Sequence, residues 1–137
     1  MKKLFLILWL LILTGCGKKE IIICTNNKKM NEINLNSKIN VFIDSSRFKK
    51  LEIEVDIIVP EPLLNQKELI IKGVEEKYKK LGDKYNSTPV TTETDNGAKL
   101  TMEMTAEQAK EFSGSKNDKA TRQDVIDIFG KQDFECK

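Results

Sequence analysis

The chain has 137 residues, of which 23 are basic and 21 acidic, and it contains no histidine. This length fits one domain with a single hydrophobic core. The near balance of charge argues against a nucleic-acid-binding protein, because such proteins carry a clear basic excess. The lack of histidine removes the commonest general base, the commonest metal ligand and every nucleophile that a histidine activates. We therefore expect no enzyme, no metal site and no cofactor.

The N-terminus has the pattern of a secretory signal. A basic head at residues 1–3 precedes ten consecutive apolar residues, 4–13. Spanning a bilayer takes about 20 apolar residues, so this run is too short for a transmembrane helix. Removal of residues 1–15 takes away Lys2 and Lys3 and leaves 21 basic and 21 acidic residues. The mature part is therefore expected to be neutral.

The sequence Leu-Thr-Gly-Cys at residues 13–16 resembles the bacterial lipobox, in which the cysteine thiol receives a diacylglycerol before cleavage. By this resemblance, residues 1–15 are a lipoprotein signal peptide, Cys16 is lipidated, and residues 16–20 form a short tether. The membrane partner would then be reached through the diacylglycerol on Cys16. The predicted location is the extracytoplasmic face of the cell membrane. The alternative is an ordinary secretory signal with an incidental cysteine.

Two further cysteines lie near the ends of the mature chain, Cys24 and Cys136. A thiol pair outside the cytoplasm can oxidise and stay oxidised, so we favour a disulfide between them. Such a bond would contribute about 4–5 kcal/mol in the chain-entropy model. The alternatives are two buried free thiols or a redox pair, although no Cys-x-x-Cys spacing supports the latter.

Strands are predicted over much of the first half of the chain. Residues 21–25 form a short β-branched run, and residues 33–43 and 51–59 alternate apolar and polar residues. Period two with one apolar face is typical of half-buried antiparallel strands, here joined by a turn at residues 44–47. The two apolar rows are Ile33, Leu35, Ile39, Val41 and Ile43, and Leu51, Ile53, Val55, Ile57 and Val59.

Both apolar rows carry odd numbers, and directly opposed residues share a face of the sheet. The loop between paired residues should therefore hold an odd number of residues, which excludes a simple two-residue turn. The outward rows should bring Lys38 close to Glu52, Glu54 and Asp56. We interpret this row as a solvated polar face rather than a cation site.

A central helix follows the prolines at positions 60 and 62, because the apolar period changes from two to that of a helix. It begins near Leu63 or Asn65, and Gly82 is predicted to follow its last turn. Tyr78 is interpreted as a core residue. The apolar stripe consists of Leu63, Ile70, Ile71, Val74, Tyr78 and Leu81.

A second hairpin is predicted over residues 90–104. A three-residue loop with Gly97 in the left-handed conformation keeps one face less polar. The pairs expected in this register are Val90 with Met102, Thr92 with Leu100, and Thr94 with Ala98.

Two short helices complete the chain. Thr105 with Gln108 predicts a capping box for the first, and residues 121–124 open the second, which ends at Gly130. Residues 134–137 can then run along the sheet edge beside Cys24. The predicted fold class is α+β. Residues 21–137 form one domain, with an antiparallel sheet of two hairpins and short terminal strands packed against a central and a C-terminal helix.

The order of these features resembles the small YehR-like bacterial lipoproteins, a family of unknown function. The resemblance rests on the lipobox, on Cys24-Thr25 at an early strand, on the order hairpin, helix, hairpin, and on the closing Phe134-Glu135-Cys136-Lys137. It implies an α+β domain on a lipid anchor and supplies no activity or cofactor.

The functional hypothesis is a non-enzymatic binding or structural module of the cell envelope whose partner is an envelope protein or a small ligand. The alternative is an extracytoplasmic thiol-redox protein that uses Cys24 and Cys136. A transporter's binding component ranks last, because 137 residues are too few for two lobes.

Overall fold

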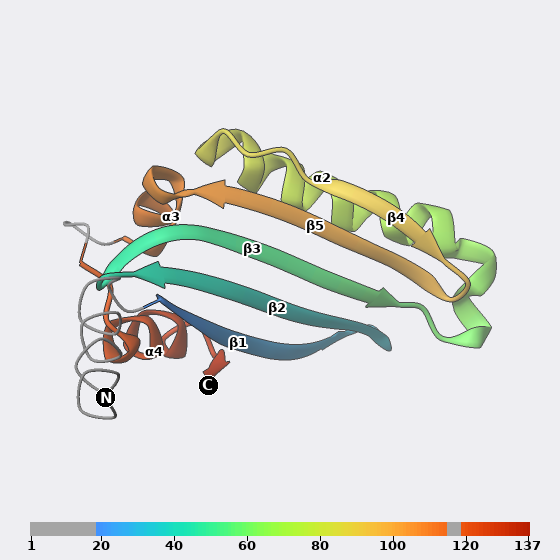
Figure 1. Ribbon diagram of the computed structural model, residues 1–137. Coiled ribbons are helices and arrows are strands. Elements are labelled where there is room, and N and C mark those ends of the chain that lie inside the picture. Colours follow the sequence, from blue (N-terminus) through green and yellow to red (C-terminus); the bar gives the residue numbers. More distant parts are fainter. Residues whose placement is uncertain (1–18, 115–118) are drawn as a thin grey trace, which may run out of the picture.

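The computed structural model describes residues 19–114 and 119–137 and confirms the predicted α+β class (Figure 1). Within these residues, an antiparallel sheet of six strands has the order β4-β5-β3-β2-β1-β6. The strands are β1 (Lys19–Met30), β2 (Ile33–Asp44), β3 (Arg47–Ile58), β4 (Val90–Thr94), β5 (Gly97–Thr105) and β6 (Glu135–Cys136). The helices are a 3₁₀ turn η1 (Glu61–Gln66) that continues into α2 (Lys67–Tyr85), and α3 (Ala106–Ser113) and α4 (Arg122–Gly130).

Strand β1 is longer than predicted. It begins at Lys19, inside the segment expected to be a tether, and pairs with β2 as far as Met30 opposite Ile33. The turn between these strands places Asn31 and Glu32 at φ values of 49° and 71°. The extension could not be predicted from the apolar pattern, because Asn26 and Lys28 interrupt the apolar row that faces the core.

The β2–β3 connection is a two-residue turn, so the prediction that excluded such a turn was wrong. Asp44 pairs with Arg47, and Ser45 and Ser46 both have positive φ, as this turn requires. A β-bulge between Phe42 and Ile43 shifts the pairing by one residue, so the odd-numbered apolar residues of the two strands still lie on the same face of the sheet.

The predicted register of the second hairpin was also wrong. The turn holds two residues, with Thr94 opposite Gly97 and Thr91 opposite Leu100, and Val90 is 59% exposed. The structure needs glycine at position 97 for close approach to β3 rather than for a left-handed turn. A Cβ atom there would lie 1.6 Å from the carbonyl oxygen of Ile57.

Some of the predicted helix ends are confirmed and others are wrong. Helix α2 ends at Tyr85 and is capped by Asn86, whose φ of 56° is left-handed, so Gly82 is not the residue that follows its last turn. Gly82 lies inside the helix, where a Cβ atom would meet the Ser87 carbonyl oxygen at 2.2 Å. The capping boxes at Thr105 and Thr121 are confirmed.

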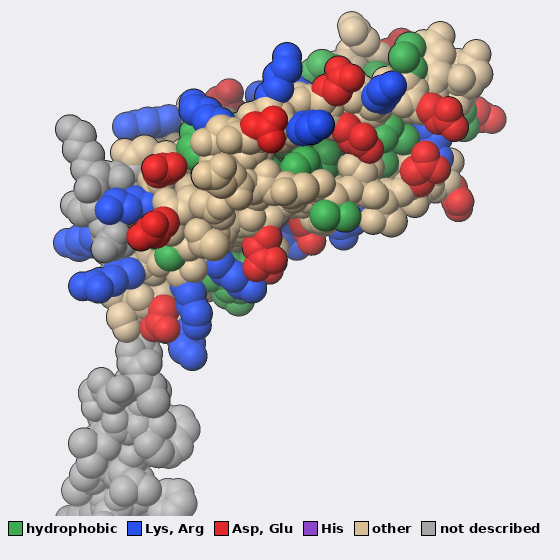
Figure 2. All heavy atoms as spheres, turned by 90° about the horizontal axis from the view of Figure 1, so that it is seen from above, with side chains coloured by type: hydrophobic (Ala, Val, Ile, Leu, Met, Phe, Trp, Pro, Cys, Tyr) green, Lys and Arg blue, Asp and Glu red, His purple; other side chains and the backbone are tan. Residues whose placement is uncertain are grey.

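One face of the sheet forms the core and the other is polar. Lys38 pairs with Glu54, as predicted for the outward row, and Lys50 lies 3.1 Å from Glu52 in an ion pair. Seen from above, charged side chains of both signs are scattered over the visible face, and hydrophobic ones show in smaller areas between them (Figure 2). The core-facing strand residues that are buried are Ile22, Cys24, Leu35, Ile39, Val41, Ile43, Phe48, Leu51, Ile53, Val55, Ile57, Ala98, Leu100, Met102 and Met104.

Replacing Gly97 with alanine tests the close contact between β5 and β3. The added methyl group must displace the backbone at Ile57, and we expect the free energy of unfolding to fall by about 3 kcal/mol in urea titration. Gly130→Ala is the control, because no atom lies within 4 Å of its Cβ position. Equal stability of the two variants would contradict this account of the hairpin register.

Candidate ligand-binding cleft

Helix α2 is held at both ends above the β4–β5 hairpin. The Lys67 ammonium group donates to the Thr94 carbonyl, and the Ser87 hydroxyl donates to the Glu103 carbonyl at 2.6 Å. The sheet is wider than the helix: six strands span about 24 Å, whereas a helix is about 10–12 Å across. Since α2 is fixed near one edge, it leaves part of the apolar face over β1 and β2 uncovered.

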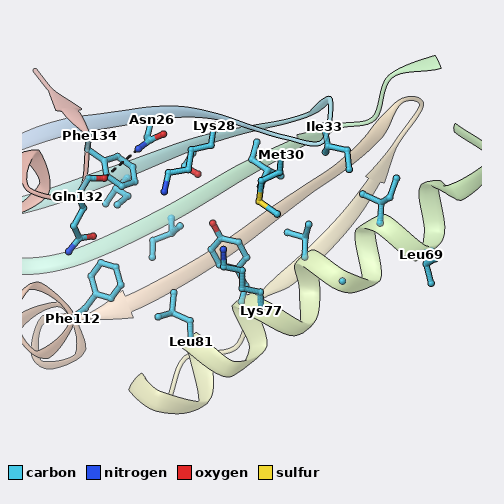
Figure 3. Close-up of a pocket in the computed structure, with 18 residues that line it drawn as sticks. Asn26, Lys28, Met30, Ile33, Leu69, Lys77, Leu81, Phe112, Gln132 and Phe134 are labelled. Carbon is cyan, nitrogen blue, oxygen red and sulfur yellow. Dashed lines mark hydrogen bonds between the residues drawn. The ribbon is translucent and has the colours of Figure 1, made fainter. Parts of the chain in front are cut away.

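A cleft of about 570 Å³ fills this space between α2 and the sheet (Figure 3). Strands β1, β2 and β3 form one wall, α2 forms the other, and α3 and the C-terminal segment lie at one end. The apolar residues that line it are Met30, Ile33, Leu35, Ile39, Ile53, Leu69, Ile70, Val74, Leu81, Phe112 and Phe134.

The polar groups of the cleft are few and carry no negative charge. Lys28 and Lys77 line it from opposite walls, Ser37 and Tyr78 add hydroxyl groups, and Asn26 and Gln132 add amides. No aspartate or glutamate among the residues that the structure describes lines it. In Figure 3 both lysine side chains extend toward the space between β1 and α2. Among the described residues, neither lysine makes an ion pair.

Tyr78 reaches from α2 toward the sheet and is half-buried, so it lines the cleft as well as packing on the core. Burial raises the pKa of its phenol above 10.0, and a hydrogen bond with the Ser37 side chain partly opposes this rise. The phenol is therefore neutral near pH 7 and can both donate and accept a hydrogen bond inside the cleft.

Gly73 marks an open place on the helix wall of the cleft. No atom lies within 4 Å of the position that its Cβ would occupy. A glycine inside a helix costs up to about 1 kcal/mol relative to alanine, so the position loses stability and leaves room. Open space beside a backbone is where a bound molecule can approach a helix closely.

The C-terminal segment closes one end of the cleft. Asn26 donates through Nδ2 to the carbonyl of Asp133 at 3.0 Å, and Phe134 lines the cleft beside it. The predicted disulfide between Cys24 and Cys136 is present, with an S–S distance of 2.01 Å. Because β6 pairs with β1 at these two residues, the bond fixes the segment against the sheet.

The sequence-predicted site residues are only partly covered by the structure. Cys16 and the predicted signal peptide lie outside the described residues. Cys24 and Cys136 are brought together, and Cys24 has no exposed surface.

The cleft itself was not predicted. Two sequence features could have indicated it: Ser37, a polar residue in an apolar row, and Gly73, a glycine inside a predicted helix. Lys28 is exposed near the β1–β2 turn and lies on the core-facing side of β1, where it lines the cleft.

Within residues 19–114 and 119–137, no group of three or more histidine, cysteine, aspartate or glutamate side chains is placed to hold a metal ion. No helix in the same ranges is both long enough and apolar enough to cross a membrane.

Comparison with known proteins gives this chain no relative: no family model, no curated protein and no solved structure matches it significantly.

Proposed function

We propose that this protein is a lipid-anchored module of the cell envelope that binds a small ligand with a long apolar part in the cleft between α2 and the sheet, without catalysing a reaction. The observation that carries the proposal is the cleft itself. Its volume of about 570 Å³ lies within the range of about 300–1,000 Å³ that is typical of ligand pockets.

The chemistry of the walls supports an apolar ligand. Each methylene group that such a ligand buries contributes about 0.8 kcal/mol. Met30 and Leu69 at the rim are 48% and 73% exposed, and large exposed apolar side chains beside a groove are typical of binding sites. Figure 3 places Met30 and Ile33 at the hairpin end of the cleft, opposite Phe112 and Phe134 at the other end.

The residues of the cleft do not favour catalysis. Among the described residues, the titratable groups that line it are Lys28, Lys77 and Tyr78, and the lining contains no carboxylate or thiol. A nucleophile paired with a base, or two carboxylates facing one another, is absent from this lining, so the usual arrangements for acyl transfer and glycoside hydrolysis are not formed there. This supports a binding role.

The location rests on two arguments. Disulfides persist in oxidising compartments, so the Cys24–Cys136 bond favours the outside of the cytoplasmic membrane. The resemblance of residues 13–16 to a lipobox and of the whole chain to YehR-like lipoproteins adds the anchor. With β1 beginning at Lys19, a lipidated Cys16 would hold the domain close to the membrane surface.

The alternative, a thiol-redox protein, has less support. Thiol–disulfide exchange needs an accessible sulfur, whereas Cys24 is fully buried and Cys136 is half-buried. The bond lies in the β1–β6 pairing and in the hydrophobic core, which favours a structural disulfide.

Gly73→Trp tests the binding proposal, because the indole should fill the open cleft without disturbing the core. The lipidated protein in phosphatidylcholine vesicles is photolabelled with a long-chain alcohol that carries a diazirine, and labelled peptides are identified by mass spectrometry. In the wild type we expect labels on cleft residues of β2 and α2. Gly73→Trp should reduce them at least about tenfold, because about two methylene groups would stay unburied.

Gly130→Trp is the matched control, because its Cβ position is also open and it lies on α4 outside the cleft. It should label like the wild type. Labels spread evenly over both faces of the sheet, or undiminished in Gly73→Trp, would contradict the proposed binding site.

Cys16→Ala tests the anchor. Two or more acyl chains hold a small domain stably on a bilayer, at about 0.8 kcal/mol per buried methylene. We expect this variant to lose metabolic palmitate labelling and the mass of the lipid, whereas Cys24→Ala/Cys136→Ala should keep both. A Cys16→Ala protein that is still cleaved after residue 15 and still carries lipid would overturn the assignment.

A further inference from the structure

Lys28 and Lys77 add positive charge to a cleft whose walls are mostly apolar. Lys28 lies on the core-facing side of β1, opposite Leu35 of β2 in the register, and Lys77 projects from α2 across the cleft. Lysines usually keep their charge in water or pair it with a carboxylate. Lys28 and Lys77 are both exposed to solvent, and they border a groove to which no described aspartate or glutamate contributes.

The two lysines lie in the middle part of the cleft, with apolar residues toward both of its ends. Ser37 and the Tyr78 hydroxyl form a hydrogen-bonding pair near the lysines. Toward the β1–β2 hairpin the lining becomes apolar, with Ile33, Ile70 and Leu69. The half of the cleft between the lysines and the β1–β2 hairpin therefore complements a molecule with a charged head and a hydrocarbon chain.

We propose that the ligand is a long-chain fatty acid, with its carboxylate between Lys28 and Lys77 and its chain in the hairpin half of the cleft. This inference rests on the proposed binding function and adds the ligand class. Two positive charges in a lining to which no described aspartate or glutamate contributes favour an anionic head over a neutral or cationic one, although Lys28 also borders a separate hollow with Asp133 and Glu135. Gly73 lies one turn from Lys77 and one turn from Leu69, so the chain would run along the open side of that glycine.

The test compares two photoactivatable probes that differ only in the head group, a diazirine fatty acid and the matching fatty alcohol. The lipidated protein is used in phosphatidylcholine vesicles. For Lys28→Glu/Lys77→Glu we expect labelling of the cleft by the acid to fall about tenfold, because two attractive contacts become repulsive. Labelling by the alcohol should change less than about twofold, because the apolar walls are intact.

Lys29→Glu/Lys72→Glu is the control with the same change of net charge. Lys29 is the neighbour of Lys28 on the other face of β1, Lys72 lies on α2, and neither lines the cleft. This variant should label with both probes as the wild type does. Thermal unfolding of all variants checks that the charge changes leave the fold intact.

The outcomes separate this inference from the binding proposal. If the alcohol labels the cleft as well as the acid does, and charge reversal changes neither, the cleft binds apolar ligands but the fatty-acid inference is wrong. If neither probe labels the cleft, the binding proposal fails as well. A lysophospholipid that displaces the acid probe at a much lower concentration than oleate does would overturn the assignment to a fatty acid.

Discussion

The fixing of α2 to the β4–β5 hairpin is the constraint on which the rest of the structure depends. The Lys67 contact with the Thr94 carbonyl holds the first turn of the helix, and the Ser87 contact with the Glu103 carbonyl holds the chain just after its last turn. Gly82 allows that end to fold back tightly, because a side chain there would strike the Ser87 carbonyl. These contacts hold the helix over the β4–β5 hairpin, and an apolar cleft lies between it and β1 and β2.

The C-terminal segment fixes the other edge of the sheet, at β1. Phe129, which is fully buried, has its ring centroid 6.2 Å from those of both Phe112 and Phe134, so three aromatic side chains join α3, α4 and the segment that leads into β6. The Cys24–Cys136 bond and the Asn26 hydrogen bond to Asp133 fasten this group to β1. One end of the cleft is thus built from covalent and aromatic contacts, while the hairpin end has exposed apolar residues at its rim.

Much of the fold could be predicted because each strand interior and each helix cap depends on neighbouring residues. The rows of residues 33–43 and 51–59 and the caps at Thr105 and Thr121 are of this kind. The two hairpin registers depend instead on contacts between strands. In the β2–β3 hairpin, a bulge beside Phe42 shifts the pairing by one residue. In the β4–β5 hairpin, the close approach of Gly97 to Ile57 determines the register. The cleft could not be predicted, because an apolar row shows which side chains face the helix layer and not whether a helix lies above them.

The most direct test of the binding site is methyl NMR of the lipidated protein in nanodiscs during titration with oleate. We expect the methyl resonances of Ile33, Leu35 and Val74 to shift in a saturable way, because these residues line the cleft. The resonances of Ile23 and Val90, which are exposed and lie outside the cleft, should stay in place. Shifts at Ile23 and Val90 with none at the cleft residues would contradict the account.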